Sequence, residues 1–277
     1  MSVKLAKNAG FCFGVSRAVE TVQQEAAAGK QVVTLGPIIH NRHVVGKFES
    51  LGVGVIDTPE EAPAGATVII RSHGVSKEVY DRLQQREVEI VDATCPFVER
   101  VHKAAREFAE KGLRVVVIGH PGHIEVKGIV GEVGEAVVIS NVAAAREFCA
   151  ATADAAARLG VVSQTTMNAD EVAEIVAALK TRFKVETTAE VCNATKLRQD
   201  AVKAFGGDAV LVLGSASSSN TARLCECAPC RAFRAGTMDE VKSLDLSGVT
   251  HLGVTSGAST PEEFLKAAVA WLRGERT

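Results

Sequence analysis

Three cysteines stand where a thiol can do chemistry, at junctions between an extended segment and a helical pattern. Cys12 lies between glycines in Gly10–Gly14, which allow close backbone approach and positive φ around the thiol. Cys95 and Cys192 each precede a helical pattern, where the field of the helix N-terminus favours a thiolate. Taken singly, a cysteine is more often a buried apolar residue. Three of them at such junctions favour metal ligation.

The spacing of these cysteines bears on the kind of metal. Cys12 and Cys95 are 83 positions apart, and Cys95 and Cys192 are 97 positions apart. A zinc site completed by histidine is the rival interpretation, but structural zinc favours close pairs such as C-x2-C. Three thiolates without an evident fourth fit one 4Fe-4S cluster whose remaining iron is left open for substrate.

Four further cysteines bring the total to seven, and an odd total does not suit a disulfide framework. Cys149 falls in an alanine-rich helical pattern and is expected in a core. Cys225, Cys227 and Cys230 form a late group that Pro229 interrupts. On a helix only Cys227 and Cys230 would share a face, so this is an incomplete ferredoxin-type set. Core packing and a second metal or redox site both stay open for it.

Polar residues in other junctions suit an anionic ligand. His40, His73 and His123 each have glycine, serine or proline neighbours and no obvious acidic partners, which suits phosphate oxygens better than a metal. Two later helix starts add further groups that can bind an anion: side-chain hydroxyls, an amide and backbone N–H groups. These residues are Ser218, Ser219, Asn220 and Ser259.

Glu125 is the strongest prediction for a proton donor. A carboxyl that is buried near a cluster and a diphosphate is pushed towards its protonated form, which suits a general acid. Thr165 and Thr166 stand ready to orient a hydroxyl or relay a proton. The alternative for Glu125 is a solvated residue at a helix start.

Eight β-branched runs alternate with helical patterns and must position these residues. The expected strands are Gln31–Leu35, Ala66–Arg71, Val88–Asp92, Arg114–Ile118, Ala136–Ile139, Leu159–Ser163, Ala209–Leu213 and Thr250–Thr255. The expected helices are Val15–Ala28, Lys77–Arg86, Phe97–Gly112, Asp170–Thr181, Thr195–Phe205 and Pro261–Arg273. The reactive residues follow the carboxyl ends of strands, where ligands of open α/β sheets bind.

The cysteine spacing is about one small α/β unit, although no sequence repeat has that period. We therefore expect an α/β fold of three similar small lobes in a trefoil-like arrangement around a central iron-sulfur cluster. The expected lobes are residues 13–95, residues 96–192, and residues 193–277 together with 1–12.

Composition limits the classes of partner. The chain has 277 residues, 47% of them hydrophobic and 23% charged, with a formal net charge of −2. Because it has no basic tail or stripe, we expect no nucleic acid and no acidic membrane surface as partner. No apolar run approaches the roughly 20 residues of a membrane span, and the first residues do not resemble a secretory signal, so we expect a cytoplasmic protein.

Nine motifs occur in the order found in one known family. They are GFCFGVSRAV, HNRHVV, RSHGV, DATCPFV, GHPGHIEV, SQTT, CNAT followed by RQ, GSASSSN and TSGAS. By these motifs the chain resembles the family of 4-hydroxy-3-methylbut-2-enyl diphosphate reductases, over Gly10 to about Ser259. This family provides the last step of the methylerythritol phosphate route to isoprenoids.

The resemblance implies an iron-sulfur oxidoreductase of isoprene biosynthesis. The expected reaction is reductive dehydroxylation of 4-hydroxy-3-methylbut-2-enyl diphosphate to isopentenyl and dimethylallyl diphosphate, with two electrons from a ferredoxin or flavodoxin. It implies metal ligation by Cys12, Cys95 and Cys192, and a catalytic role for Glu125. The substrate-binding residues it implies are His40, His73, His123, Thr165, Thr166, Ser218, Ser219, Asn220 and Ser259. We also predict that Asn193, next to Cys192, contacts the substrate.

Two positions depart from the family pattern. Asn193 stands where an aromatic residue is expected after the third cysteine, and the late cysteine group falls where the family carries no thiols. These departures leave two alternatives open: a divergent paralogue that uses the same open-iron site on another substrate, and a non-catalytic iron-sulfur sensor. Glu125 favours catalysis, since a sensor does not need a carboxylate in that motif.

Overall fold

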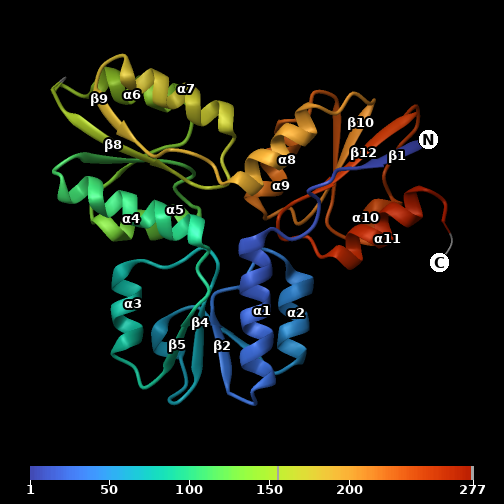
Figure 1. Ribbon diagram of the computed structural model, residues 1–277, viewed down its shortest axis with the longest axis horizontal. Coiled ribbons are helices and arrows are strands. Elements are labelled where there is room, and N and C mark those ends of the chain that lie inside the picture. Colours follow the sequence, from blue (N-terminus) through green and yellow to red (C-terminus); the bar gives the residue numbers. More distant parts are fainter. Residues whose placement is uncertain (155, 276–277) are drawn as a thin grey trace. The chain divides into compact units, whose positions relative to one another are not determined.

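The strands in the described part of the chain form three separate four-stranded sheets in which all pairings are parallel (Figure 1). The computed structural model describes residues 1–154 and 156–275. In spatial order, one sheet contains β3 (Gly54–Ile56), β2 (Val32–Leu35), β4 (Thr67–Ile70) and β5 (Glu89–Asp92). Another contains β7 (Val137–Ile139), β6 (Arg114–Ile118), β8 (Arg158–Ser163) and β9 (Lys184–Thr187). The last contains β11 (Arg231–Ala235), β10 (Ala209–Leu213), β12 (His251–Ser256) and β1 (Ser2–Leu5).

The three sheets share one strand order. Within each, the second strand along the chain lies at an edge, followed by the first, the third and a fourth. In the last sheet the fourth place is taken by β1, from the other end of the chain. The expected α/β class with three similar lobes is therefore confirmed, although the architecture repeats without a sequence repeat.

Helices connect the strands. They are α1 (Phe13–Ala27), α2 (Arg42–Ser50), α3 (Lys77–Gln84), α4 (Pro96–Glu110), α5 (Ile124–Val133), α6 (Val142–Ala151), α7 (Ala169–Lys180), α8 (Asn193–Lys203), α9 (Ser219–Glu226), α10 (Met238–Lys242) and α11 (Glu262–Leu272), with a short 3-10 turn η1 (Pro59–Glu61). No helix in the described ranges is both long and apolar enough to cross a membrane.

The chain divides into two compact units, each described by itself. The terminal unit comprises residues 1–16, 39–47 and 192–277, and the middle unit comprises residues 17–38 and 48–191. The sheet with β1 belongs to the terminal unit and the other two sheets belong to the middle unit. The predicted lobe boundaries stay a prediction, and residues 276 and 277 of the third lobe lie outside the described part.

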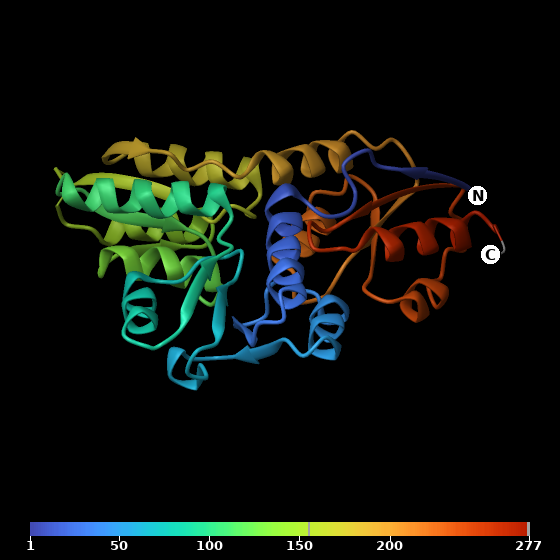
Figure 2. The ribbon, with the colours of Figure 1, turned by 60° about the horizontal axis from the view of Figure 1, so that its bottom comes forward.

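In the middle unit, the β6–β9 sheet is covered on both faces because its central strands carry continuous apolar runs, Val115–Ile118 in β6 and Leu159–Val162 in β8. Val115, Val117 and Val162 pack with residues of α4 and α5 on one face. Val116 and Val161 pack with residues of α6 and α7 on the other face. Figure 1 shows these two helical layers with the strands of the sheet between them, and Figure 2 gives a second view of the same elements.

The terminal unit has the same two-faced construction. Leu211 and Val254 pack against α10 and α11 on one face of the sheet. Val210 and Val212 pack against α8 and α9 on the other face. The chain runs from the carboxyl end of β10 into α9 and from that of β12 into α11. Backbone N–H groups at these helix N-termini are available to a ligand.

Candidate functional site

Cys12 lies in a loop that hydrogen bonds hold to the end of β12. The N–H of Gly10 donates to Ser256 Oγ at 2.7 Å, and the N–H of Cys12 donates to the carbonyl of Ala258 at 3.1 Å. Gly10 has φ +98°, a conformation that a residue with a Cβ rarely adopts. Helix α1 begins directly after Cys12, as the Ser16 N–H donates to the Cys12 carbonyl.

Cys192 caps the N-terminus of α8 with its sulfur. The N–H of Thr195 donates to Cys192 Sγ at 3.4 Å, and Thr195 Oγ1 lies 3.2 Å from the same sulfur. The opening of the helix thus presents hydrogen-bond donors to this thiol, which stabilise negative charge on sulfur.

The segment Gly257–Ser259 joins the predicted anion-binding residues of the terminal unit. Ser259 Oγ donates to the His40 carbonyl at 3.4 Å, and Asn41 Nδ2 donates to the Ser259 carbonyl at 2.8 Å. A side chain at Gly257 would collide with Thr221 of α9, so the start of α9 is packed directly on this segment.

The start of α9 carries the hydroxyl and amide residues predicted from sequence. Ser218 is the N-cap and its Oγ accepts from the Thr221 N–H at 3.4 Å. Ser218 and Asn220 are buried, and within the described ranges Asn220 Oδ1 has no hydrogen-bond partner. Ser219 is half-buried, and Asn193 at the start of α8 is exposed. Buried polar atoms beside a helix N-terminus fit an anionic ligand.

In the middle unit, Cys95 caps the N-terminus of α4 through its backbone. Its N–H donates to the Ser72 carbonyl at 3.0 Å, which ties the cysteine to the residue before His73. Pro96 occupies the first position of the helix, where no N–H is needed. Arg17 Nη1 donates to the Thr94 carbonyl at 2.6 Å and fixes the approach to the cysteine.

His73 and His123 lie beside each other in the middle unit. Their ring centroids are 5.9 Å apart and the rings meet edge to face. His123 is the N-cap of α5, and its Nδ1 accepts from the Glu125 N–H at 3.2 Å. When His123 is neutral, its proton is therefore on Nε2, which makes that nitrogen a donor.

Glu125 is buried, with 1% of its surface exposed, and it faces Thr165. The Thr165 N–H donates to Glu125 Oε1 at 2.6 Å, and Thr165 Oγ1 donates to Oε2 at 3.1 Å. Burial raises the pKa of Glu125 to about 7, while the two Thr165 contacts and the charge of His102 act in the opposite direction. The interpretation of Glu125 as a solvated residue at a helix start is wrong.

Thr166 is positioned by its neighbour Gln164. Gln164 Nε2 donates to Thr166 Oγ1 at 2.8 Å, and its Oε1 accepts from the His120 N–H at 3.1 Å. A Cβ at Gly119 would lie 2.6 Å from Val126, so the loop after β6 can approach α5 only because that residue is glycine.

A polar network lies behind these residues in the middle unit. His102 Nδ1 is 3.0 Å from Glu132 Oε1, and Arg106 Nη1 is 2.6 Å from Glu132 Oε2. The His102 ring lies 3.3 Å from the position that a Cβ of Gly74 would take and 3.2 Å from that of Gly128. It therefore supports both the loop that follows His73 and the helix that carries Glu125.

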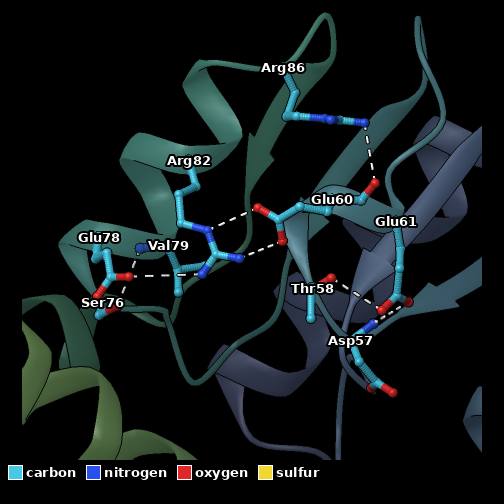
Figure 3. Close-up of polar contacts among 9 residues, drawn as sticks. All are labelled: Asp57, Thr58, Glu60, Glu61, Ser76, Glu78, Val79, Arg82 and Arg86. Carbon is cyan, nitrogen blue, oxygen red and sulfur yellow. Dashed lines mark hydrogen bonds and ion pairs between the residues drawn. The ribbon is translucent and has the colours of Figure 1, made fainter.

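Helix α3, which begins shortly after His73, is fixed at its N-terminus by Ser76 and along its length by contacts with η1. Figure 3 shows Arg82 of this helix bound to both carboxylate oxygens of Glu60 in η1, and Arg86 Nη2 donating to the Glu60 carbonyl at 3.2 Å. Ser76 caps α3 by accepting from the Val79 N–H at 3.3 Å. Between these elements and Arg71 lies a cavity of about 190 Å³.

The late cysteines lie in an apolar environment. Cys227 belongs to a cluster of buried residues with Leu224, and Cys225 and Cys230 pack against that cluster. Burial raises the pKa of both Cys225 and Cys230, which disfavours the thiolate that a metal or an oxidant needs. Core packing is therefore the better interpretation of this group.

The structure brings the predicted site residues together in two sets. Cys12, Cys192, His40, Asn193, Ser218, Ser219, Asn220 and Ser259 belong to the terminal unit, whereas Cys95, His73, His123, Glu125, Thr165 and Thr166 belong to the middle unit. None of the seven cysteines, all of which lie in the described ranges, forms a disulfide. Within the described part of the chain, no three His, Cys, Asp or Glu side chains are gathered closely enough to hold a metal ion.

Sequence reasoning missed a polar face on α8. Thr195, Arg198 and Gln199 are all at most 4% exposed, in the same helix as the buried Val202. This spacing is that of a helix face turned to a core, and polar residues on such a face are uncommon. The spacing was readable from the sequence and would have singled out Arg198.

Comparisons with known proteins agree over nearly the whole chain. The family model described as LytB protein matches residues 3–273. The 4-hydroxy-3-methylbut-2-enyl diphosphate reductase of Anaplasma marginale is 38% identical over 284 residues, covering 98% of this chain and 82% of the relative. The protein of the same name from Acidothermus cellulolyticus is 39% identical over 280 residues, with the same coverage of both.

Solved structures give the same result. The E-1-hydroxy-2-methyl-but-2-enyl-4-diphosphate reductase of Plasmodium falciparum superposes with a TM-score of 0.90 at 30% identity, covering 98% of this chain and 87% of that one. A structure of (E)-4-hydroxy-3-methyl-but-2-enyl diphosphate reductase, described as the terminal enzyme of the non-mevalonate pathway, has a TM-score of 0.69 at 33% identity. That match covers 99% of this chain and all of the other.

Proposed function

The chain belongs to the LytB protein family, and from this membership and the geometry above we propose that it reduces 4-hydroxy-3-methylbut-2-enyl diphosphate to isopentenyl and dimethylallyl diphosphate. Replacing the allylic hydroxyl by hydrogen consumes two electrons and two protons and releases water. The protein must therefore hold a diphosphate, deliver protons and accept electrons from a donor, for which we propose a ferredoxin or flavodoxin.

Proton delivery is the role of Glu125, and its contact with Thr165 is the observation that carries the proposal. A carboxyl with a pKa of about 7 is substantially protonated at neutral pH, so it can donate to a departing hydroxide. Thr165 Oγ1, at 3.1 Å from Glu125 Oε2, orients the acid and passes the proton to an adjacent oxygen. Thr166, fixed by Gln164, orients the substrate hydroxyl.

Diphosphate binding falls to the imidazoles and to the hydroxyl and amide groups at helix starts. His123 donates through Nε2 because its Nδ1 already accepts from a backbone N–H. His73, beside it, adds a second imidazole, and His40 is held by Ser259. The start of α9 adds Ser218, Ser219 and Asn220, together with the N–H groups of the first turn.

Cys12, Cys95 and Cys192 have the donor chemistry of iron-sulfur ligands, and a cluster spans more space than the single metal ion for which the described residues hold no group of three ligands. Each of the three lies at a helix start and forms no disulfide, Cys192 Sγ accepts from the Thr195 N–H, and the late cysteines lie in apolar packing instead. When bound, such a cluster supplies electrons one at a time, and three protein ligands leave one of its irons open. The protein's own part is to bind, orient and protonate the substrate.

An anaerobic turnover assay tests the function. The full chain is incubated with a reduced one-electron donor and the hydroxylated diphosphate, and the products are separated by chromatography. Formation of isopentenyl and dimethylallyl diphosphate supports the proposal. A protein that contains iron and sulfide but leaves the substrate unchanged is instead a sensor or a paralogue with another substrate.

The ligand set has its own test. We expect Cys95→Ser to lose the colour and the iron of anaerobically purified protein, which should hold about four irons per chain. Cys227→Ser is the matched control, because that thiol lies in an apolar cluster. Equal loss of iron in both variants contradicts the ligand set. The three-lobe boundaries and a cytoplasmic location belong to the same proposal.

A further inference from the structure

Arg198 is a buried cation in the terminal unit that the roles above do not use. It lies in α8, six residues after Cys192, and is 4% exposed. Burial of an arginine is costly unless its charge and its donors are satisfied. A side chain of this kind calls for an explanation beyond packing.

The guanidinium ties two segments that are far apart in sequence. Nη2 donates to the Gly10 carbonyl at 2.8 Å, and Nη1 donates to the Ala194 carbonyl at 2.9 Å. Gly10 is two residues before Cys12, and Ala194 is two residues after Cys192. The planar fork of one arginine thus fixes the loop of one cysteine relative to the helix start of the other.

The charge of Arg198 interacts electrostatically with the same two cysteines. Burial lowers the pKa of Arg198, while negative charge on Cys12 and Cys192 acts to raise it, which means that both sulfurs lie within electrostatic reach. Within the described ranges its Nε has no hydrogen-bond partner. An arginine stays protonated even when buried, so a fixed positive charge acts on these sulfurs.

We propose that Arg198 is a positioning residue that aligns the Cys12 loop with the Cys192 helix and whose positive charge raises the reduction potential of the bound cluster. The inference rests on the proposed function for the presence of that cluster. Net charge and hydrogen bonding around cluster sulfurs set its potential. A charge out of contact with water is weakly screened, so its effect on the sulfurs is large.

Two variants separate the effect of the hydrogen bonds of Arg198 to Gly10 and Ala194 from the effect of its charge. Arg198→Gln keeps a hydrogen-bond donor but removes the charge. Arg198→Lys keeps the charge but replaces the planar fork by a single ammonium, which does not reproduce both hydrogen bonds in one plane. Lys196→Gln is the matched control, because it removes a positive charge from an exposed position on the same helix.

The measurement is a redox titration of the anaerobically purified full chain, followed by optical or EPR spectroscopy, with iron counted per chain. We expect the midpoint potential of Arg198→Gln to fall by at least about 59 mV, a tenfold less favourable one-electron reduction, and that of Lys196→Gln to stay near wild type. We expect Arg198→Lys to keep the wild-type potential but to lose iron to a chelator several-fold faster.

The outcomes are distinguishable. A loaded Arg198→Gln protein with the wild-type potential overturns the role of the charge. If Arg198→Gln does not fold, the test rests on Arg198→Lys. Iron loss from Arg198→Lys that is as slow as from wild type overturns the proposed alignment of the Cys12 loop with the Cys192 helix. Wild-type protein without a cluster refutes the proposed function rather than this inference.

Discussion

Replacing Glu125 by glutamine should make the stability of the protein less sensitive to pH. The substitution keeps the shape of the side chain and both contacts with Thr165, because the amide oxygen can accept from the backbone N–H and the amide nitrogen can donate to Oγ1. What it removes is the ability of the buried group to ionise.

The magnitude follows from the raised pKa. Burial raises the pKa of Glu125 from 4.5 to about 7, so the folded state holds this proton more tightly than the unfolded chain does. Stability therefore falls as pH rises from 4.5 to about 7 and stays lower above that range. At 1.36 kcal/mol per pKa unit the full effect is about 3 kcal/mol. About 2.5 kcal/mol of it falls between about pH 5 and pH 8.

Urea unfolding of both proteins at several pH values between these limits measures this effect. Because other titrating groups are common to both, the difference between their unfolding free energies isolates residue 125. We expect Glu125→Gln to gain about 2.5 kcal/mol relative to wild type over that interval. A difference that does not change with pH refutes the assignment of a protonated, buried carboxyl.

Three further substitutions, one of them with a matched control, test the site and the packing that supports it. Asn220→Asp puts a carboxylate at the proposed diphosphate site, and kcat/KM should fall about 100-fold, or about 2.7 kcal/mol, with iron content unchanged. Gly160→Ala places a Cβ 2.5 Å from Phe108 and should cost about 1–3 kcal/mol in urea unfolding, while Gly46→Ala, where no described atom lies within 4 Å, should be neutral or stabilising. Burial works to raise the pKa of Glu132, but contacts with His102 and Arg106 outweigh it and lower the pKa. Its stabilisation is present above pH 4.5 and lost as pH falls further, so Glu132→Gln should be about 1–3 kcal/mol less stable at neutral pH and approach wild type in acid.

The central strands could be predicted from the sequence, and several edge strands could not. The strands β6 and β10 have the predicted bounds. The strands β2, β5, β7 and β8 differ from the prediction by one residue at one end, and β4 and β12 differ by one residue at each end. The strands without a prediction are β1, β3, β9 and β11, all at sheet edges. Edge strands such as Lys184–Thr187 are short and partly exposed, so they lack the continuous apolar run that reveals a buried parallel strand.

The polar residues at strand ends could be predicted because glycine, serine and proline mark the junctions around them. The burial of Glu125 could not, since a carboxylate after a histidine reads equally well as a solvated helix start, and only tertiary packing against Thr165 decides. The contact between Arg198 and Gly10 joins residues 188 positions apart, and no local pattern encodes such a contact.

The most direct test of the proposed function compares wild type with Glu125→Gln in one anaerobic reaction, with the hydroxylated diphosphate and a reduced one-electron donor. We expect wild type to form isopentenyl and dimethylallyl diphosphate. We expect Glu125→Gln to keep its iron and bind the diphosphate but to turn over about 100-fold or more slowly. Equal product formation by the two proteins, or none by an iron-loaded wild type, contradicts the proposed function.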